Sequence, residues 1–273
     1  VVPRLGGIAF VPAIFLSIAF VAGVNAMLYK NQIFMALGQI PLQLCFGLCA
    51  LMLMYLVGMA DDLVGVRYRA KFLAQIIAGV LIVMSGLVVD DLHGFFFLGI
   101  LPLPVAWVLT VIALVLIVNA VNLIDGIDGL ASGLCGIALL FFGIVFFAVD
   151  EMVYSLIAFA AFGTLVPFFY YNVFGEAKVK KKIFMGDTGA LTTGVVLSIL
   201  VVKICMIPRI NIVEMNPIVL AYSPLIVPCF DVVRVYLHRV RAGRNPFLPD
   251  KCHIHHKMLA LGMNQRVVMP IIL

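Results

Sequence analysis

Carboxylates stand at the ends of apolar runs in this sequence. Asp61 and Asp62 follow one run directly in GMADDLVG, and Asp187 opens another in FMGDTGA. The carboxyl end of a helix already carries partial negative charge, so two carboxylates placed there need a cation nearby. A purely structural role would be capping of the next helix or pairing with nearby basic residues for the first pair, and an N-cap for Asp187. We favour a metal-binding or catalytic role for Asp61 and Asp62. For Asp187 taken singly the capping role stays open, and a capping carboxylate can keep one oxygen free for another partner.

The segment NAVNLIDGIDGLASG places Asn119, Asn122, Asp125 and Asp128 at steps of three residues. Each such step falls about 60° short of a full turn on an ideal helix, so the four side chains cannot share one face. A glycine follows each aspartate, which predicts that the helix ends between the asparagines and the aspartates. Amide and carboxylate oxygens suit a hard cation such as Mg²⁺, whereas the alternative is turn chemistry that only builds the connection.

Three histidines, His253, His255 and His256, form a cluster in PFLPDKCHIHH, after an arginine-rich stretch. Guanidinium groups match phosphate oxygens, and an imidazolium adds further donors. A zinc site is the competing interpretation, and the lack of matched cysteine or carboxylate spacing argues against it. A lysine-rich stretch before Asp187 also fits an orientation signal or contacts with lipid headgroups. The two basic stretches contain Arg234, Arg239, Arg241 and Arg244, and Lys178, Lys180, Lys181 and Lys182.

The elements that must position these residues are membrane-spanning helices. Of the 273 residues, 64% are hydrophobic and only 11% are charged, and the mean hydropathy of +1.21 is far above that of a soluble domain. Because the apolar runs lack the alternation of barrel strands, we predict an all-α polytopic membrane protein. The six cysteines show no paired spacing and fit small core residues. Eight spans are expected near 6–29, 38–60, 70–90, 102–122, 129–149, 152–172, 187–208 and 216–236, followed by a truncated ninth from Val267.

The distribution of charge predicts the orientation of these spans. If the first span runs outward from the cytoplasm, fifteen of the eighteen Lys and Arg residues fall on the cytoplasmic side. Only Lys30, Lys203 and Arg209 fall on the other side. The candidate acids, amides and histidines lie on the same side as the bulk of the positive charge, at the depth of lipid headgroups. Oxygen ligands for a divalent ion and cations for phosphate at that depth predict phosphoryl transfer to a lipid.

Several motifs in order resemble those of the bacterial polyprenyl-phosphate N-acetylglucosaminyl-1-phosphate transferases. They are PRLGG at 3–7, MADDLVG at 59–65, NAVNLIDGIDGLASG at 119–133, FFYYN before FMGDTGA, and PFLPDKCHIHH at 246–256. The resemblance covers nearly the whole chain. It implies one transmembrane catalytic domain over 1–273, trimmed from a ten- or eleven-helix fold, with an active site built from cytoplasmic loops near 61–70, 123–129, 173–187 and 237–266.

The resemblance implies transfer of a sugar 1-phosphate from a UDP-N-acetylhexosamine, most simply UDP-GlcNAc, to polyprenyl phosphate such as undecaprenyl phosphate, with release of UMP. This step would begin cell-envelope glycan synthesis at the bacterial inner membrane, with Mg²⁺ or alternatively Mn²⁺ as cofactor. Asp187 and Asn122 would hold the metal, and Asp61 and Asp62 would lie beside the acceptor phosphate. Further roles fall to Lys71 and Gln75 at the acceptor phosphate, and to Asn119, Asp125, Asp128, Asn172, Phe184, Arg241, Arg244, His253, His255 and His256 at the nucleotide, diphosphate and sugar.

Alternatives remain open within and beyond this family. The chain has His-Ile-His-His-Lys where phospho-N-acetylmuramoyl-pentapeptide transferases are expected to have three consecutive histidines and an acid, which argues against that branch. A transferase for a 6-deoxy-N-acetylhexosamine is not distinguished. A secondary transporter would need inverted repeats and charges at the midplane, and the sequence has neither. We expect membrane lipids as partners, no nucleic acid, and, from relatives that dimerise, a homodimer.

Overall fold

The computed structural model describes residues 5–28, 35, 37–38, 40–176, 181–207, 215–243 and 253–273. Within these residues the chain is helical, and its one β-type contact is an isolated bridge between Asp91 and Ile100. The all-α prediction is therefore confirmed. The helices are η1 (Gly6–Ala9), α1 (Phe10–Leu28), α3 (Pro41–Val64), α4 (Tyr68–Met84), η2 (Phe95–Phe97), α5 (Leu103–Ile124), α6 (Leu130–Ala148), α7 (Met152–Val173), α8 (Gly186–Cys205), α9 (Pro217–Tyr222), η3 (Ser223–Leu225), α10 (Ile226–Arg241), α11 (Ile254–Ala260) and α12 (Gln265–Ile272).

Seven segments of the described chain are long and apolar enough to cross a membrane, which makes this a multi-pass membrane protein. Helix α4, predicted as the third span at 70–90, is not among these seven. It has 17 residues, and a rise of about 1.5 Å per residue gives it a length of about 26 Å, at the lower limit for crossing a bilayer. The seven segments are Gly6–Leu28, Pro41–Val64, Leu103–Ile124, Leu130–Ala148, Met152–Val173, Gly186–Cys205 and Pro217–Arg241.

Three predicted boundaries are wrong in ways that affect the site. Helix α3 continues through Asp61 and Asp62 to Val64, so the connection to α4 is only Gly65 to Arg67 and not the predicted loop of ten residues. Helix α4 ends at Met84, six residues before the predicted end, because the chain turns immediately afterwards. The predicted span at 216–236 is broken into α9, η3 and α10 near two prolines and continues to Arg241.

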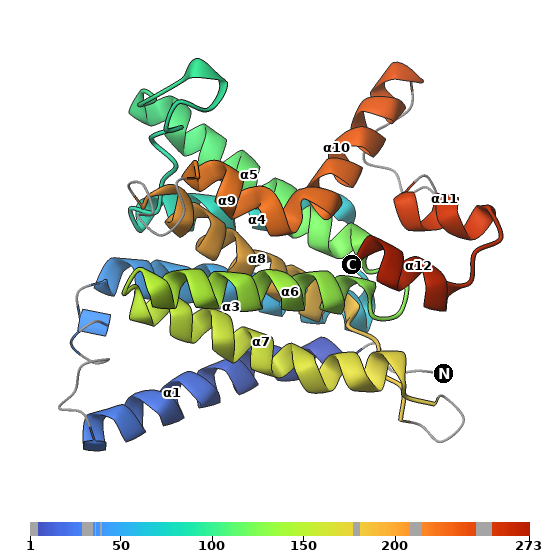
Figure 1. The fold of residues 1–273 in the computed structure, drawn as a ribbon, viewed down its shortest axis with the longest axis horizontal. Coiled ribbons are helices and arrows are strands. Elements are labelled where there is room, and N and C mark those ends of the chain that lie inside the picture. Colours follow the sequence, from blue (N-terminus) through green and yellow to red (C-terminus); the bar gives the residue numbers. More distant parts are fainter. Residues whose placement is uncertain are drawn as a thin grey trace.

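Helix α8 forms the centre of the bundle. Its apolar window is 89% buried inside the protein, compared with 28% for α1 and for α3. It packs mainly against α3 and α5, and Figure 1 shows it between them. The first half of α8 is rich in glycine, alanine and threonine, which lets neighbouring backbones approach closely. The close packing of α8 therefore starts in its first turn, directly after Asp187.

Both labelled chain ends and the two short helices α11 and α12 lie at one end of the bundle (Figure 1). The up-and-down course of the spans brings the carboxyl ends of α3, α5 and α7 to this end, together with the amino ends of α4, α6 and α8. The described parts of the acidic, amide and histidine motifs, namely Asp61 and Asp62, 119–128, Asp187 and 253–256, therefore lie at this end.

Candidate active site

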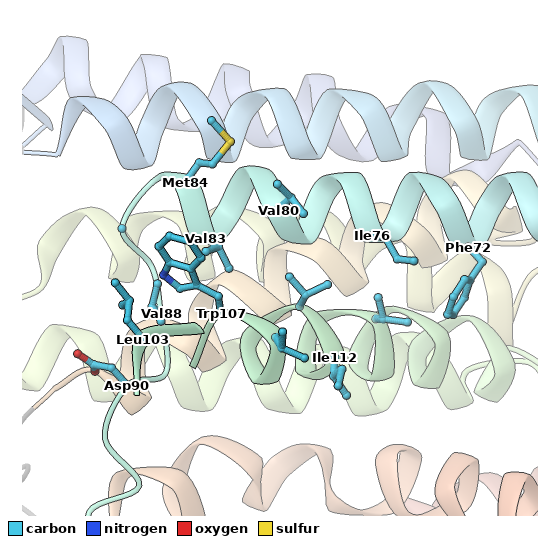
Figure 2. A pocket seen from close by; sticks show the side chains of 14 residues that line it. Phe72, Ile76, Val80, Val83, Met84, Val88, Asp90, Leu103, Trp107 and Ile112 are labelled. Atoms are coloured by element: carbon cyan, nitrogen blue, oxygen red, sulfur yellow. The ribbon is translucent and has the colours of Figure 1, made fainter. Parts of the chain in front are cut away.

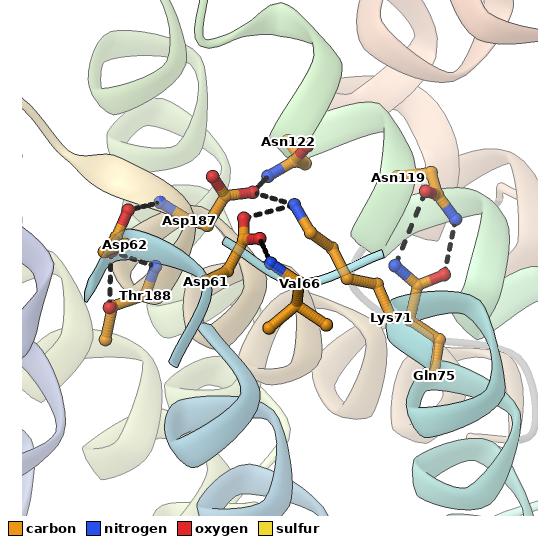
Figure 3. Close-up of polar contacts among 9 residues, drawn as sticks. All are labelled: Asp61, Asp62, Val66, Lys71, Gln75, Asn119, Asn122, Asp187 and Thr188. Carbon is orange, nitrogen blue, oxygen red and sulfur yellow. Dashed lines mark hydrogen bonds and ion pairs between the residues drawn. The ribbon is translucent and has the colours of Figure 1, made fainter. Parts of the chain in front are cut away.

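Lys71 joins the two acidic motifs at this end of the bundle (Figure 3). Its ammonium lies 2.8 Å from Asp187 Oδ1 and also pairs with Asp61 Oδ2. The other oxygen of Asp61 accepts the backbone N–H of Val66, in the short connection before α4. Lys71 is in the first turn of α4, so α3, α4 and α8 meet at one cation.

Asp62 caps helix α8 from outside it. Its Oδ1 accepts the backbone N–H of Asp187 at 2.8 Å, and its Oδ2 accepts the N–H and hydroxyl of Thr188 at 2.9 and 2.6 Å. Asp62 thus accepts backbone N–H groups that have no partner within α8, a helix that starts 124 residues further along the chain. Its negative charge also interacts favourably with the partial positive charge at the amino end of α8. Asp62 therefore positions Asp187.

A glycine allows this close contact between α3 and α8. Gly58 lies one turn before Asp62, and a Cβ atom added to it would be 2.6 Å from Thr188 Cα and 2.9 Å from Thr188 N. Those neighbours are backbone atoms and cannot rotate away. Any larger residue at position 58 would push the start of α8 away from α3.

Asn122 and Asp187, the predicted metal pair, are in contact. The Nδ2 of Asn122 donates to Asp187 Oδ1 at 2.8 Å, from the last turn of α5. Helix α5 ends at Ile124 with Asp125 as its C-cap, so the prediction that the helix ends between the asparagines and the aspartates is confirmed. A cavity of about 300 Å³ opens beside the pair, lined by Asp62, Asn122, Asp125, Gly126, Ile127, Asp128, Asn172, Phe184, Gly186 and Asp187.

Negative charge is in excess around this cavity. Burial, and then the neighbouring carboxylates Asp187, Asp128 and Asp62, raise the pKa of Asp125 to about 7. Such a shift marks a place where a bound cation would be stabilised. Among the described residues, no three His, Cys, Asp or Glu side chains form a group able to hold a metal by themselves. The donors that are present, the carboxylate of Asp187 and the amide of Asn122 beside a carboxylate-lined cavity, are of the kind that Mg²⁺ uses, since it binds proteins through one or two carboxylates and keeps water and phosphate ligands.

Gln75 and Asn119 pair with each other across α4 and α5. The Nδ2 of Asn119 donates to Gln75 Oε1 at 2.6 Å, and the Nε2 of Gln75 donates to Asn119 Oδ1 at 3.4 Å. Asn119 Nδ2 also donates to the carbonyl of Val115 at 2.7 Å, and Gln75 is only 2% exposed. Gln75 and Lys71 occupy one face of α4, but Gln75 contributes by joining α4 to α5.

Asn172 joins the segment after α5 to the segment before α8. Its Oδ1 accepts the N–H of Gly129 at 2.6 Å, and its Nδ2 donates to the carbonyl of Ile183 at 2.8 Å. Next to it, Lys182 pairs with Asp128 and lies 5.8 Å from the ring centre of Phe184. Asn172, Asp128 and Phe184 therefore lie together at one wall of the cavity, and their predicted binding roles stay predictions.

The glycines of the PRLGG motif dock on the same segment. The N–H groups of Gly6 and Gly7 donate to the carbonyls of Phe184 and Met185, each at 3.0 Å. Pro3, Arg4, Lys178, Lys180 and Arg244 lie outside the described residues, so their predicted roles stay predictions. Arg241 is exposed at the carboxyl end of α10.

The histidine cluster lies against the loop that follows α5. His255 is 1% exposed, and its ring fills the space in front of Gly126, where an added Cβ would be 2.2 Å from His255 Nε2. Its ring centre is 4.2 Å from that of His256 and 6.0 Å from that of His253. Burial, followed by the neighbouring His256 and His253, lowers the pKa of His255 to about 4. A neutral imidazole therefore packs against Gly126, a residue of the cavity wall, while His255 itself does not line the cavity.

Two polar residues of this end were missed in the sequence. Thr188 stands directly after Asp187 and reads as an ordinary helix residue. Asp231, in α10, accepts from His253 Nδ1 at 2.8 Å and from Arg234 at 2.6 Å. Its sequence signal was available, because an acid inside an apolar span is costly and usually functional.

The family model of glycosyl transferase family 4 matches residues 44–205. The chain is 28% identical over 267 residues to the undecaprenyl-phosphate alpha-N-acetylglucosaminyl 1-phosphate transferase of Yersinia pestis, covering 97% of this chain and 67% of that protein. It is 32% identical over 269 residues to a probable undecaprenyl-phosphate N-acetylglucosaminyl 1-phosphate transferase of Bacillus subtilis, covering 98% and 68%. A decaprenyl-phosphate N-acetylglucosaminephosphotransferase of Mycobacterium leprae is 32% identical over 100 residues, which is 34% of this chain. The matched region contains the whole cluster around Lys71, Asn122 and Asp187, and the chain belongs to glycosyl transferase family 4.

Proposed function

We propose that this protein transfers N-acetylglucosamine 1-phosphate, or a related sugar 1-phosphate, from a UDP-sugar to a polyprenyl phosphate and releases UMP. The observation that carries the proposal is the joining of Asp61, Asn122 and Asp187 through Lys71 beside a carboxylate-lined cavity. The names of the relatives supply the acceptor and the sugar. The remaining chemistry is proposed from the side chains of the site.

The reaction needs positioning more than a base. A phosphate monoester has a second pKa of about 6, so the acceptor phosphate is already mostly dianionic at neutral pH. One of its oxygens forms a bond to the β-phosphorus of the UDP-sugar while the bond from that phosphorus to the bridging oxygen breaks and UMP leaves. The ammonium of Lys71 is placed to hold the acceptor phosphate, and Asp61 orients that ammonium. We therefore favour direct attack over a covalent aspartyl phosphate.

Asp187 and Asn122 are the side chains that would hold Mg²⁺, with Mn²⁺ as an alternative. When bound, the ion would offset the charge of the donor diphosphate. Asp62 keeps Asp187 at the start of α8 by accepting two backbone N–H groups and the hydroxyl of Thr188. Asp125, Asp128 and Phe184 line the cavity on the side proposed for the uridine.

An apolar groove between α4 and α5 fits the isoprenoid chain of the acceptor (Figure 2). Its volume is about 890 Å³, and it runs from Phe72, the neighbour of Lys71, to Met84 and Trp107 at the far end of the helices. An acceptor with its phosphate at Lys71 could lay its first isoprene units along this groove. The lining residues are Phe72, Ile76, Val80, Val83, Met84, Gly86, Val88, Asp90, Leu103, Trp107, Val108, Val111, Ile112 and Val115.

The proposed site faces the cytoplasm of a bacterial inner membrane. In the sequence, fifteen of the eighteen Lys and Arg residues fall on the side of Asp61 and Asp187. A UDP-sugar is charged and cannot cross lipid, so the site must open to the side of the membrane on which the donor is present. We propose that this is the cytoplasmic side. Accessibility of a cysteine introduced at Lys257 to a membrane-impermeant reagent, in intact cells and in inverted vesicles, tests this orientation.

The deciding experiment is UMP release by purified protein with polyprenyl phosphate, Mg²⁺ and a panel of UDP-sugars. We expect metal-dependent UMP release with UDP-GlcNAc or a close relative, and a loss of at least 100-fold in Asp187→Ala and Asp61→Asn. The panel includes UDP-N-acetylmuramoyl-pentapeptide and a 6-deoxy-N-acetylhexosamine donor, so the other branches are tested together. Release from no donor, or full turnover in both variants, contradicts the proposal. Uptake of a substrate into liposomes without product would favour a transporter instead.

A further inference from the structure

Asp231 is a carboxylate that the proposed reaction does not use. It lies in α10, inside the segment Pro217–Arg241, and is only 5% exposed. A carboxylate at such a position is strongly unfavourable unless its oxygens are fully paired. Both oxygens of Asp231 are paired. Their partners are His253, the backbone of Ile254 and Arg234.

The hydrogen bonds of Asp231 fix where the protons are. Oδ1 accepts from Arg234 Nη2 at 2.6 Å and from the backbone N–H of Ile254 at 3.1 Å, and both groups can only donate. Oδ2 lies 2.8 Å from His253 Nδ1. An ionised carboxylate only accepts, so the proton of this contact must be on Nδ1. Nε2 is then the ring nitrogen without a proton in the neutral imidazole.

The position of His253 is transmitted to the cavity wall. Its ring is nearly parallel to that of His255, at 8° between planes and 6.0 Å between centres. Neither ring nitrogen of His255 has a hydrogen-bond partner among the described residues, so packing alone holds this ring against Gly126. Asp231 also caps α11 through Ile254, since His253 at the N-cap position makes no side-chain cap.

We propose that Asp231 is a positioning residue that sets the tautomer and orientation of His253 and thereby holds the histidine cluster against the donor side of the cavity. The inference rests on the proposed function for its catalytic consequence. It assigns to α10 a role in the reaction although no residue of α10 lines the cavity. Ionised carboxylates that orient an imidazole in this way are common partners of catalytic and metal-bound histidines.

The Asp231→Asn variant makes a sharp prediction about the tautomer. If the amide oxygen faces Arg234 and Ile254, its NH₂ group faces His253, and Nδ1 must become an acceptor. The reverse orientation would place the NH₂ group against two donors, which is unfavourable. We therefore expect His253 to change from the Nδ1–H to the Nε2–H form, with kcat lower by about 10- to 100-fold and the KM for polyprenyl phosphate unchanged. Asp231→Glu should restore the Nδ1–H form and part of kcat.

The measurement is the ¹⁵N spectrum of the histidine side chains, with the His253 signals identified by their loss in His253→Asn. Asp91→Asn is the matched control, because Asp91 Oδ2 lies 3.6 Å from His93 Nδ1 far from the site. It should leave kcat and the His253 signals unchanged. An Nε2–H form of His253 in the unmodified protein overturns the inference, even if the variants at 231 fail to fold. So does a normal kcat in Asp231→Asn. Absence of UMP release by the unmodified protein would refute the proposed function alone, since the spectrum still tests the contact.

Discussion

At the scale of single residues, the site separates its acids into two kinds. Asp61 and Asp187 share the ammonium of Lys71, whereas Asp62 and Asp231 use their oxygens on backbone N–H groups and side-chain donors that hold other elements. Residues of the first kind can exchange partners when a substrate enters. Those of the second kind cannot do so without loosening a helix end. Substitutions of the two kinds should therefore have different signatures.

Replacement of Lys71 by methionine should lower kcat by about 100-fold, because the cation proposed to hold the acceptor phosphate is lost. The same change should lower the Mg²⁺ concentration needed for half-maximal rate. A cation bound at Asp187 would compete with an ammonium 2.8 Å from the same oxygen. UMP release measured over a Mg²⁺ series checks both effects. Arg69→Met, an exposed neighbour, serves as control. A higher Mg²⁺ concentration for half-maximal rate in Lys71→Met than in the unmodified protein would contradict this account.

Asp62→Ala tests the capping role. Loss of the cap on α8 should cost about 1–2 kcal/mol of unfolding free energy and also reduce turnover, since Asp187 would lose its fixed position. Asp62→Asn, which keeps one acceptor oxygen, should be intermediate in both. The check is a thermal unfolding curve in detergent beside the rate of UMP release. A full loss of turnover with an unchanged melting temperature would instead favour direct contact of Asp62 with the acceptor phosphate.

At the scale of elements, the important contact is between the short tail helix α11 and the loop after α5. His255 reaches Gly126 across the gap, and no hydrogen bond of its ring to a described residue holds it there. The wall of the cavity therefore depends on how well these two pieces fit. This fit can be tested in two ways: by a larger side chain at position 126, and by protonation of His255.

Gly126→Ala should disturb this fit directly. The added methyl group would stand 2.2 Å from His255 Nε2, so the ring must leave its place. We expect kcat/KM for the UDP-sugar to fall by about 10- to 100-fold, the effect of a displacement on the order of 1 Å. Gly163→Ala, in α7 with open space around it, is the matched control and should be neutral. Equal kinetics for the two variants would exclude the proposed contact.

The charge on His255 gives the protein a predictable response to acid. The pKa of His255 is about 4 in the folded protein against 6.5 for a free histidine, so the unfolded chain binds more protons between these values. The stability contributed by the neutral ring is complete above pH 6.5 and is lost as the pH falls toward 4. We expect the melting temperature to fall by about 2–6 °C between pH 7 and pH 5 from this group. In His255→Asn that part of the pH dependence should vanish, and its persistence would refute the assignment.

The elements also show what a sequence can and cannot predict. The end of α5 between Asn122 and Asp125 followed from helical phase and from the glycines, both local properties. The capping of α8 by Asp62 did not follow, because it joins residues 125 apart and depends on how α3 packs on α8. The contact of Asp231 with His253 escaped for the same reason. Hydropathy predicted the spans but not the break between α9 and α10, although Pro224 and Pro228 stand beside that break in the sequence.

At the scale of the whole molecule, the groove between α4 and α5 separates recognition of the lipid chain from the chemistry. Its lining is apolar apart from Asp90 at the far end, and only Phe72 lies near the site. The isoprenoid chain of the acceptor should therefore be bound along α4 and α5, so that binding depends on chain length. The phosphate should be bound separately, at Lys71.

Filling the groove should affect long acceptors selectively. Val80→Trp places a large side chain in the groove, and we expect the KM for a long polyprenyl phosphate to rise by roughly tenfold, the factor for about 1.4 kcal/mol of lost apolar burial. A short-chain acceptor should be unaffected. The matched control is Ile77→Trp, since Ile77 is as exposed as Val80, at 44%, but does not line the groove. Equal effects of the two variants on both acceptors would mean that the chain binds elsewhere.

The central position of α8 has a consequence for how this protein can diverge. In α8, 89% of the apolar window is buried inside the protein, so few substitutions there are neutral. In α1 and α3 only 28% is buried, so one apolar residue can replace another where the helix faces lipid. In a library of all single substitutions selected for function, positions in α8 should therefore be nearly invariant and the outer faces of α1 and α3 nearly free. The positions that tolerate substitution would then identify, from the selection data alone, the helix faces that contact lipid.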